Sequence, residues 1–201
     1  CIRDSGGSFG EADGTVAAIN VTLVGKSDRT VSVSYSLVDG TATQPSDYGT
    51  VAGTIVWLPV ETGWKTVDVT LVDDGTDEAD ETFTVELSSV VPTGTTLAVA
   101  SAVVTIVDDE EAVISTSDVS VGEAGVSVVV TVSLSVPMST ASSVDFNVTS
   151  GTATSGDDFD AASGTLTFSA GQTSRTFVVV VQDDNIDEAD ETATIRLTNA
   201  V

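Results

Sequence analysis

The stretch Val31-Ser32-Val33-Ser34-Tyr35-Ser36-Leu37 decides the fold class, because apolar and polar residues alternate along its whole length. Successive side chains of an extended strand point to opposite faces, so the apolar residues of this stretch form one face that can be buried. The same alternation recurs at residues 67–71, 83–87 and 144–148. These stretches predict strands with one face in a core and the other in water.

The composition agrees with this prediction. Val, Thr, Ser, Ala, Gly and Asp dominate the chain, whereas the strong helix formers Leu, Lys, Arg and Gln are scarce. Turn signals rich in Gly and Asp separate the apolar runs at short intervals, which is typical of an antiparallel sandwich or barrel. No stretch predicts a convincing amphipathic helix. The sequence therefore predicts an all-β protein.

The chain contains two copies of one unit. Gly40-Thr41-Ala42-Thr43 returns as Gly151-Thr152-Ala153-Thr154, 111 residues later. The acidic stretch at residues 73–82 returns at residues 183–192, with an offset of 110. Such self-similarity indicates a tandem duplication. We predict two domains, residues 1–110 and residues 111–201.

The second copy is shorter than the first. A predicted strand at residues 99–107 in the first copy has no counterpart, because only four residues follow Leu197. The second sandwich is therefore expected to lack its last strand. Two explanations stay open: the chain is an excised fragment, or another chain supplies the strand by strand addition in a polymer.

Charge and the missing residue types exclude several functions. The chain has 31 acidic and 6 basic residues, a net charge of −25, which repels nucleic acid. The absence of His removes the usual general base and every His-containing zinc site, and the single Cys cannot form an internal disulfide. No apolar run approaches the roughly 20 residues that span a membrane. These exclusions leave an acidic protein whose natural small partner is a hard cation.

Two acidic loops carry the candidate chemistry. Residues 73–81 hold six carboxylates, residues 183–191 hold six more, and neither stretch contains a Lys or Arg. A solvated acidic loop is the simplest interpretation, but the recurrence of the run with its spacing intact favours a cation site. The run Asp-Asp-Glu-Glu at residues 108–111 should lie at one end of the same sandwich. Many flexible oxygen ligands are what Ca²⁺ prefers. Paired carboxylates also serve glycosidases, but these are too crowded to flank a sugar, so we expect no enzyme.

The first copy reads Gly-Thr-Ala…Ser-Asp-Tyr…Gly-Thr…Asp-Asp…Asp-Glu-Ala-Asp-Glu-Thr-Phe…Leu. This string resembles the Calx-β domain, and the resemblance covers essentially the whole chain as two tandem copies. That domain occurs in the regulatory region of sodium–calcium exchangers and in many surface and adhesion proteins. The resemblance implies two immunoglobulin-like Greek-key sandwiches of seven strands, less the strand that the second copy lacks, with Ca²⁺ held by loops at one end.

The resemblance also implies a set of calcium ligands in each copy. In the first copy the matching residues are Glu11, Asp47, Asp73, Asp74, Thr76 (through its carbonyl), Glu78, Glu81, Asp108, Asp109 and Glu110. In the second copy they are Glu123, Asp158, Asp183, Asp184, Ile186 (through its carbonyl), Glu188 and Glu191. The spacing of the acidic loop indicates that Asp77 and Asp80 point away. No acidic triplet closes the second copy, so its site is expected to be incomplete.

Several functions fit a tandem calcium-binding pair. The composition, with much Ser, Thr, Val and Asp and little Lys, favours a structural or adhesion repeat of a secreted or cell-surface protein. In that function Ca²⁺ stiffens the junction between the domains, and neighbouring repeats or identical chains are the partners. One alternative is a Ca²⁺-sensing regulatory region of a transporter or receptor. Another is a subunit of an extracellular filament that is completed by strand addition.

Overall fold

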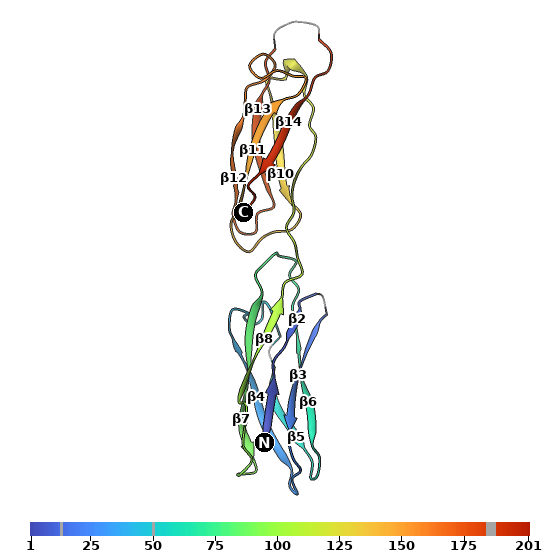
Figure 1. The fold of residues 1–201 in the computed structure, drawn as a ribbon, viewed down its shortest axis with the longest axis vertical. Coiled ribbons are helices and arrows are strands. Elements are labelled where there is room, and N and C mark those ends of the chain that lie inside the picture. The colour runs from blue at the N-terminus through green and yellow to red at the C-terminus, as the bar shows by residue number, and fades with distance from the viewer. Residues whose placement is uncertain (13, 50, 184–187) are drawn as a thin grey trace. The chain divides into compact units, whose positions relative to one another are not determined.

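The computed structural model describes residues 1–12, 14–49, 51–183 and 188–201 (Figure 1). Regular structure in these ranges is almost entirely β, and the helical element found in them is one 3₁₀ turn, η1 (Glu123–Gly125). The prediction of an all-β protein is confirmed. No helix in the described ranges is long and apolar enough to cross a membrane. Internal contacts divide the chain into two compact units, residues 1–74 with 79–109 and residues 75–78 with 110–201.

The first unit is a sandwich of two sheets. One sheet has the strand order β1-β3-β6, and the other has the order β2-β8-β7-β4-β5. The strands are β1 (Ile2–Ser5), β2 (Ser8–Gly10), β3 (Val16–Leu23), β4 (Val31–Asp39), β5 (Ala52–Trp57), β6 (Gly63–Thr70), β7 (Glu81–Val91) and β8 (Ser101–Val107). The three alternating stretches of the first copy lie within β4, β6 and β7 or reach one residue beyond them.

The start of the chain belongs to both sheets of the first unit. β1 pairs antiparallel with β3, whereas β2 pairs parallel with β8. Gly6 lies at the crossing between the two sheets, and a Cβ added there would lie 1.9 Å from the carbonyl oxygen of Val103. A side chain therefore does not fit at this position. The crossing brings residue 11, directly after β2, to the end of the last strand.

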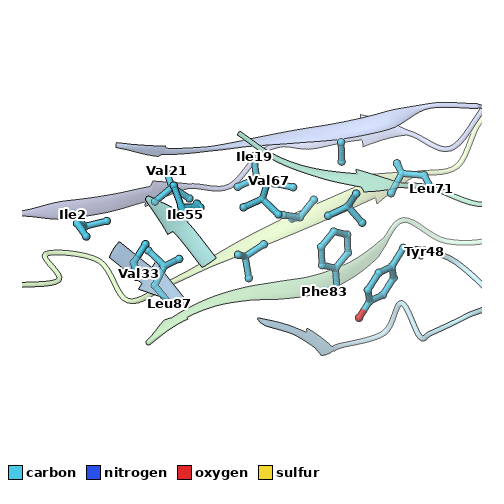
Figure 2. Close-up of a cluster of buried hydrophobic side chains, with 14 of the residues drawn as sticks. Ile2, Ile19, Val21, Val33, Tyr48, Ile55, Val67, Leu71, Phe83 and Leu87 are labelled. Carbon is cyan, nitrogen blue, oxygen red and sulfur yellow. The ribbon is translucent and has the colours of Figure 1, made fainter. Parts of the chain in front are cut away.

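The core of the first unit follows from the alternation of its strands. Figure 2 shows Ile19 and Val67 on one layer of strands and Phe83 on the facing layer. Phe83 is fully buried, and its ring stacks on that of Tyr48 with 4.2 Å between the ring centroids. Trp57 is also fully buried and donates from Nε1 to the Gly63 carbonyl at 3.2 Å. Burying such aromatic rings contributes most of the hydrophobic stabilisation of a small core.

The second unit repeats this plan with fewer strands. Its sheets have the orders β13-β10-β9 and β12-β11-β14. The strands are β9 (Ile114–Thr116), β10 (Ser127–Leu134), β11 (Ser142–Ser150), β12 (Ser163–Phe168), β13 (Ser174–Val180) and β14 (Ala193–Thr198). Phe146 and Phe177 stack in the core at a centroid distance of 3.9 Å. Within this unit β10 and β11 are the central strands of their sheets (Figure 1).

The two units differ at the last strand. β7 lies between β4 and β8, whereas β14 pairs, among the described residues, with β11 alone. Val85 of β7 is fully buried, but Ile195, the residue 110 positions later, is half-buried. The core face of β14 is thus partly exposed, whereas that of β7, which β8 flanks in the same sheet, is buried. Among the described residues no strand of the second sandwich follows β14, which confirms that prediction.

A carboxylate braces this three-stranded sheet on its polar side. Asp145 on β11 accepts a hydrogen bond from Asn199 Nδ2 at 2.9 Å and another from Thr165 Oγ1 at 2.5 Å. Thr165 is its cross-strand partner on β12, and Asn199 directly follows β14. The bond from Asn199, followed by that from Thr165, lowers the pKa of the Asp145 carboxyl below its usual value.

Candidate metal centre

Acidic residues of the first copy of the repeat meet as two groups of three carboxylates. One oxygen each from Asp47, Glu78 and Glu81 lies within 4.8 Å of the other two, and we call this group A. Glu11, Asp108 and Glu110 form group B with the same spacing. The side chains are half-buried except Glu11, which is only 8% exposed. A carboxylate as buried as Glu11 is rare in proteins unless it is paired or binds a metal.

The parallel pairing of β2 with β8 assembles group B. In this register Gly10 lies opposite Val107, so Glu11 and Asp108 follow their strands side by side. The Glu11 amide donates to the Val107 carbonyl at 3.1 Å, which continues the ladder by one more bond. Glu11 and Asp108 lie far apart in the sequence, and the pairing of β2 with β8, the last strand of the unit, brings them together. Group B therefore depends on β8 being present.

Short polar contacts orient Asp47 in group A. Its Oδ2 accepts hydrogen bonds from the Thr43 amide at 2.6 Å and from Thr43 Oγ1 at 3.2 Å. Its carbonyl accepts a bond from the Val72 amide at 3.0 Å, which ties this turn to the start of the acidic loop. Glu81 is the first residue of β7 and approaches from the other end of that loop. In the sequence Thr43 was noted only as part of the repeated Gly-Thr-Ala-Thr stretch and was not among the candidate site residues.

Four other residues matched to the first copy belong to neither group. Asp73, Asp74 and Asp109 are exposed, and Thr76 is half-buried. Their assignment as ligands stays a prediction. Asp77, which the spacing left out of the ligand set, accepts a hydrogen bond from the Ala112 amide at 2.7 Å through Oδ2, a contact internal to the second unit.

The second unit holds one group of the same kind, group C. It consists of Asp158, Glu188 and Glu191, again with one oxygen from each within 4.8 Å of the others. Asp158 is held as Asp47 is, because the Thr154 amide donates to its Oδ2 at 2.6 Å. In the described part of the chain no group in this unit matches group B, since no strand like β8 follows β14.

The other residues matched to the second copy lie outside group C. Glu123 is half-buried in η1, and its negative charge is one of the causes that raise the pKa of Glu191. Asp183 is exposed. Asp184 and Ile186 lie outside the described residues. The proposed ligand set of the second copy stays a prediction.

The charges in these groups repel one another. Partial desolvation, a hydrogen bond shared with Asp158 and the charges of Asp158, Glu188 and Glu123 together raise the pKa of the Glu191 carboxyl. Two unit charges 4 Å apart repel by about 4 kcal/mol at an effective dielectric constant of 20. A bound cation turns this repulsion into attraction. The donors are all oxygen atoms, the set that Ca²⁺ takes in proteins, whereas Zn²⁺ prefers nitrogen and sulfur.

Comparison with known proteins decides the family. The sequence model of the Calx-beta domain matches residues 4–110 and, a second time, residues 112–201. The chain belongs to the Calx-beta family. Ca²⁺ is the cation that the paired calcium-binding domains of this family bind, and the oxygen-only carboxylate groups of this chain fit that ion. The family resemblance and the calcium cofactor expected from the sequence are confirmed.

The curated relatives of this Calx-beta pair are ion exchangers. Sodium/calcium exchanger 1 of Cavia porcellus is 33% identical over 200 residues, which cover 89% of this chain and 20% of that protein. Sodium/calcium exchanger 3 of Mus musculus is 32% identical over 208 residues, which cover 90% of this chain and 22% of that protein. The Calx-beta pair thus spans about a fifth of the length of these relatives.

Solved structures agree on the fold. The calcium-binding domain pair CBD12 of CALX1.1 superposes with a TM-score of 0.51 at 19% identity, covering 100% of this chain and 80% of that one. The CBD12 pair of CALX1.2 gives a TM-score of 0.50 at 22% identity, covering 98% and 80%. The immunoglobulin-like tandem sandwich expected from the resemblance is therefore confirmed.

The comparisons also correct one expectation. An extracellular or cell-surface location is wrong, because the matching segments of the exchangers are regulatory loops on the cytoplasmic side of the membrane. The prediction of the location rested on composition, but the high content of Ser, Thr and Val reflects the β-sandwich fold and not the compartment. With the location, the support for an adhesion repeat also disappears.

Proposed function

We propose that this Calx-beta pair is a Ca²⁺-sensing regulatory region of a larger transport protein, a binding module and not an enzyme. The observation that carries the proposal is the gathering of six carboxylates of the first copy into groups A and B, two oxygen-only sets. The similarity to exchangers over nearly the whole pair supports a regulatory role over a purely structural one.

The geometry supplies a reason for a response to Ca²⁺. Without the cation, three carboxylates within 4.8 Å repel, so the loops that hold them are pushed apart. With the cation, the same oxygens become ligands, and loops from distant parts of the sequence are drawn together. Binding therefore converts an ion concentration into loop order, which an attached protein can register. The expectation that Ca²⁺ also stiffens the junction between the domains stays a prediction.

Calorimetric titration of the whole chain with Ca²⁺ tests the proposal. Sensors bind with dissociation constants of roughly 10⁻⁷ to 10⁻⁵ M, whereas extracellular structural modules bind at roughly 10⁻⁴ to 10⁻³ M. We expect at least one site in the sensor range, assigned to the first unit by its loss in Glu81→Gln. Mg²⁺ at the same concentration should compete poorly, because it demands a small octahedral site.

Asp28→Asn is the matched control for these titrations. It also removes one negative charge from the first unit, but the Asp28 side chain is 95% exposed and lies in neither group. Its dissociation constant should equal that of the unaltered chain. Binding only in the millimolar range, or equal binding by Glu81→Gln, would contradict the proposed sensing function.

A further inference from the structure

The motif Gly-Thr-Ala-Thr occurs once in each unit, at residues 40–43 and residues 151–154, and contains no acidic residue. In both units it directly follows an interior strand of a sheet, β4 or β11, and leads into the turn that carries Asp47 or Asp158. The motif itself therefore contributes no carboxylate to the metal groups. Its contacts nevertheless reach one group A carboxylate, Asp47, and the backbone of Thr82, the residue after another, Glu81.

The first contact fixes the backbone beside Glu81. Thr41 Oγ1 accepts a hydrogen bond from the Thr82 amide at 2.8 Å, and the Ala42 amide donates to the Thr82 carbonyl at 3.0 Å. Gly40 permits this approach, because a Cβ there would lie 2.3 Å from the same carbonyl oxygen. Thr82 is thus held on its donor side and on its acceptor side, one residue after a group A carboxylate.

The second contact fixes Asp47 itself. Thr43 donates to its Oδ2 from both the amide and the hydroxyl. These two bonds engage one carboxylate oxygen, so Oδ1 is not used by them. A four-residue segment therefore holds two parts of group A. It binds the Asp47 carboxylate on its own turn, and it fixes the backbone of Thr82, next to Glu81, on the neighbouring strand.

The second unit repeats this geometry with different neighbours. The Thr192 amide donates to Thr152 Oγ1 at 2.8 Å, and the Ala153 amide donates to the Thr192 carbonyl at 3.0 Å. Thr154 holds Asp158 through its amide. A Cβ on Gly151 would again lie 2.3 Å from the facing carbonyl oxygen. The arrangement recurs although, in the described residues, no strand flanks β14 as β8 flanks β7, so it does not depend on β8.

We propose that the Gly-Thr-Ala-Thr segment is a positioning element that holds the group A carboxylates Asp47 and Glu81, and their counterparts Asp158 and Glu191, in register before the cation binds. This inference rests on the proposed calcium site. The physical reason is preorganisation: ligands that repel one another must otherwise be brought together during binding, and this reorganisation weakens affinity. Thr41 acts through Thr82, so it is a positioning residue and not a ligand.

The test compares Thr41→Val with Thr41→Ser in calcium titrations of the whole chain. Valine keeps the shape of threonine but cannot accept the Thr82 amide, whereas serine keeps the hydroxyl. We expect Thr41→Val to weaken Ca²⁺ binding at the first unit about tenfold, and Thr41→Ser to restore it to within about twofold. Thr152→Val is the matched variant, and it should leave the first unit unchanged while weakening the second.

A structural effect is separated by measuring stability in chelator. If Thr41 only supports the fold, Thr41→Val lowers the unfolding midpoint but leaves the dissociation constant of the folded protein unchanged, which overturns the inference. Should Thr41→Val not fold, Thr43→Ala removes only the hydroxyl donor to Asp47, and a dissociation constant equal to that of the unaltered chain overturns the inference. Absence of Ca²⁺ binding by the unaltered chain would instead refute the proposed function.

Discussion

Asp47→Asn should have opposite effects on the first unit with and without Ca²⁺. Asparagine keeps the size of the side chain and an oxygen that can accept the bonds from Thr43, so it removes one charge and little else. The oxygens of group A lie within 4.8 Å of one another, and at that separation two charges repel by roughly 3.5 kcal/mol at an effective dielectric constant of 20. Half-exposed side chains are screened by salt. We therefore expect a net gain of about 1 kcal/mol in chelator.

The same substitution should reduce the stabilisation by Ca²⁺. A ligand at 100 times its dissociation constant stabilises the folded state by about 2.7 kcal/mol. If losing one charged ligand weakens binding tenfold, the same Ca²⁺ concentration supplies only about 1.4 kcal/mol. For a unit of about 100 residues, 1 kcal/mol shifts the unfolding midpoint by about 4–8 °C. The unfolding midpoint of Asp47→Asn in chelator should thus be about 4–8 °C above that of the unaltered chain, and its further rise in Ca²⁺ should be about half as large.

Tryptophan fluorescence reads the first unit selectively. Both Trp residues and both Tyr residues lie in the first copy, and Trp57 is fully buried. Thermal unfolding followed at this fluorescence, in chelator and in Ca²⁺, measures the two midpoints. Asp158→Asn is the control, because it makes the same change in a unit without Trp or Tyr. A midpoint that falls in chelator, or an unchanged response to Ca²⁺, would refute the electrostatic reasoning.

Three further predictions concern stability. Val85→Ala should lower the free energy of unfolding by about 2 kcal/mol, because Val85 is fully buried, whereas Ile195→Ala should have less than half that effect on its own unit. Urea unfolding followed by circular dichroism compares the two variants, and equal losses would contradict the partial exposure of the core face of β14. Gly40→Ala should destabilise by more than 2 kcal/mol, on the order of other overpacked sites, because its Cβ would meet the Thr82 carbonyl, and a neutral effect in the same assay would be inconsistent with that contact. The pKa of Asp145 is lower in the folded than in the unfolded state, so its carboxylate stabilises the fold at pH above its unfolded pKa of about 3.9 and this contribution disappears as the pH falls through the lower folded value. Asp145→Asn should therefore make acid unfolding less steep in that window, and an unchanged pH profile would show that the brace has no effect.

The fold could be predicted because its signals are local. The alternation at residues 31–37 places Val31 and Val33 inward with Ser32 and Ser34 between them, and the observed burial follows this pattern. Trp57 alternates with the buried Ile55 and is itself buried, whereas Trp64, which has no counterpart in the second copy, is 67% exposed. A period of two residues is thus enough to assign core faces.

The site could be predicted only as a collection of residues. Sequence spacing could not divide the carboxylates of the first copy into groups A and B, because the division depends on which strand ends meet. Glu11 joins Asp108 through the parallel pairing of β2 with β8, a contact between opposite ends of the domain that no local pattern contains. The threonines beside group A were noted in the sequence only as part of the repeat, and their role in the site could not be predicted for another reason. Thr41 and Thr43 are neutral and exposed, and their role is visible only in the bonds to Thr82 and Asp47.

The parallel pairing of β2 with β8 also determines how the first unit responds to force. Within the first unit the chain runs through β1, which pairs with β3, continues into β2, and reaches the end of β8 at Val107, and β2 and β8 run in the same direction. A pull on the two ends therefore loads the pairing of β1 with β3 and, behind it, slides β2 along β8, whose hydrogen bonds must break together and not one at a time. Glu11 and Asp108 lie at the end of this pairing, on the two strands that slide. A Ca²⁺ ion bound to both residues would link the two strands and oppose their sliding, so the force needed to unfold the domain would rise and fall with the concentration of Ca²⁺.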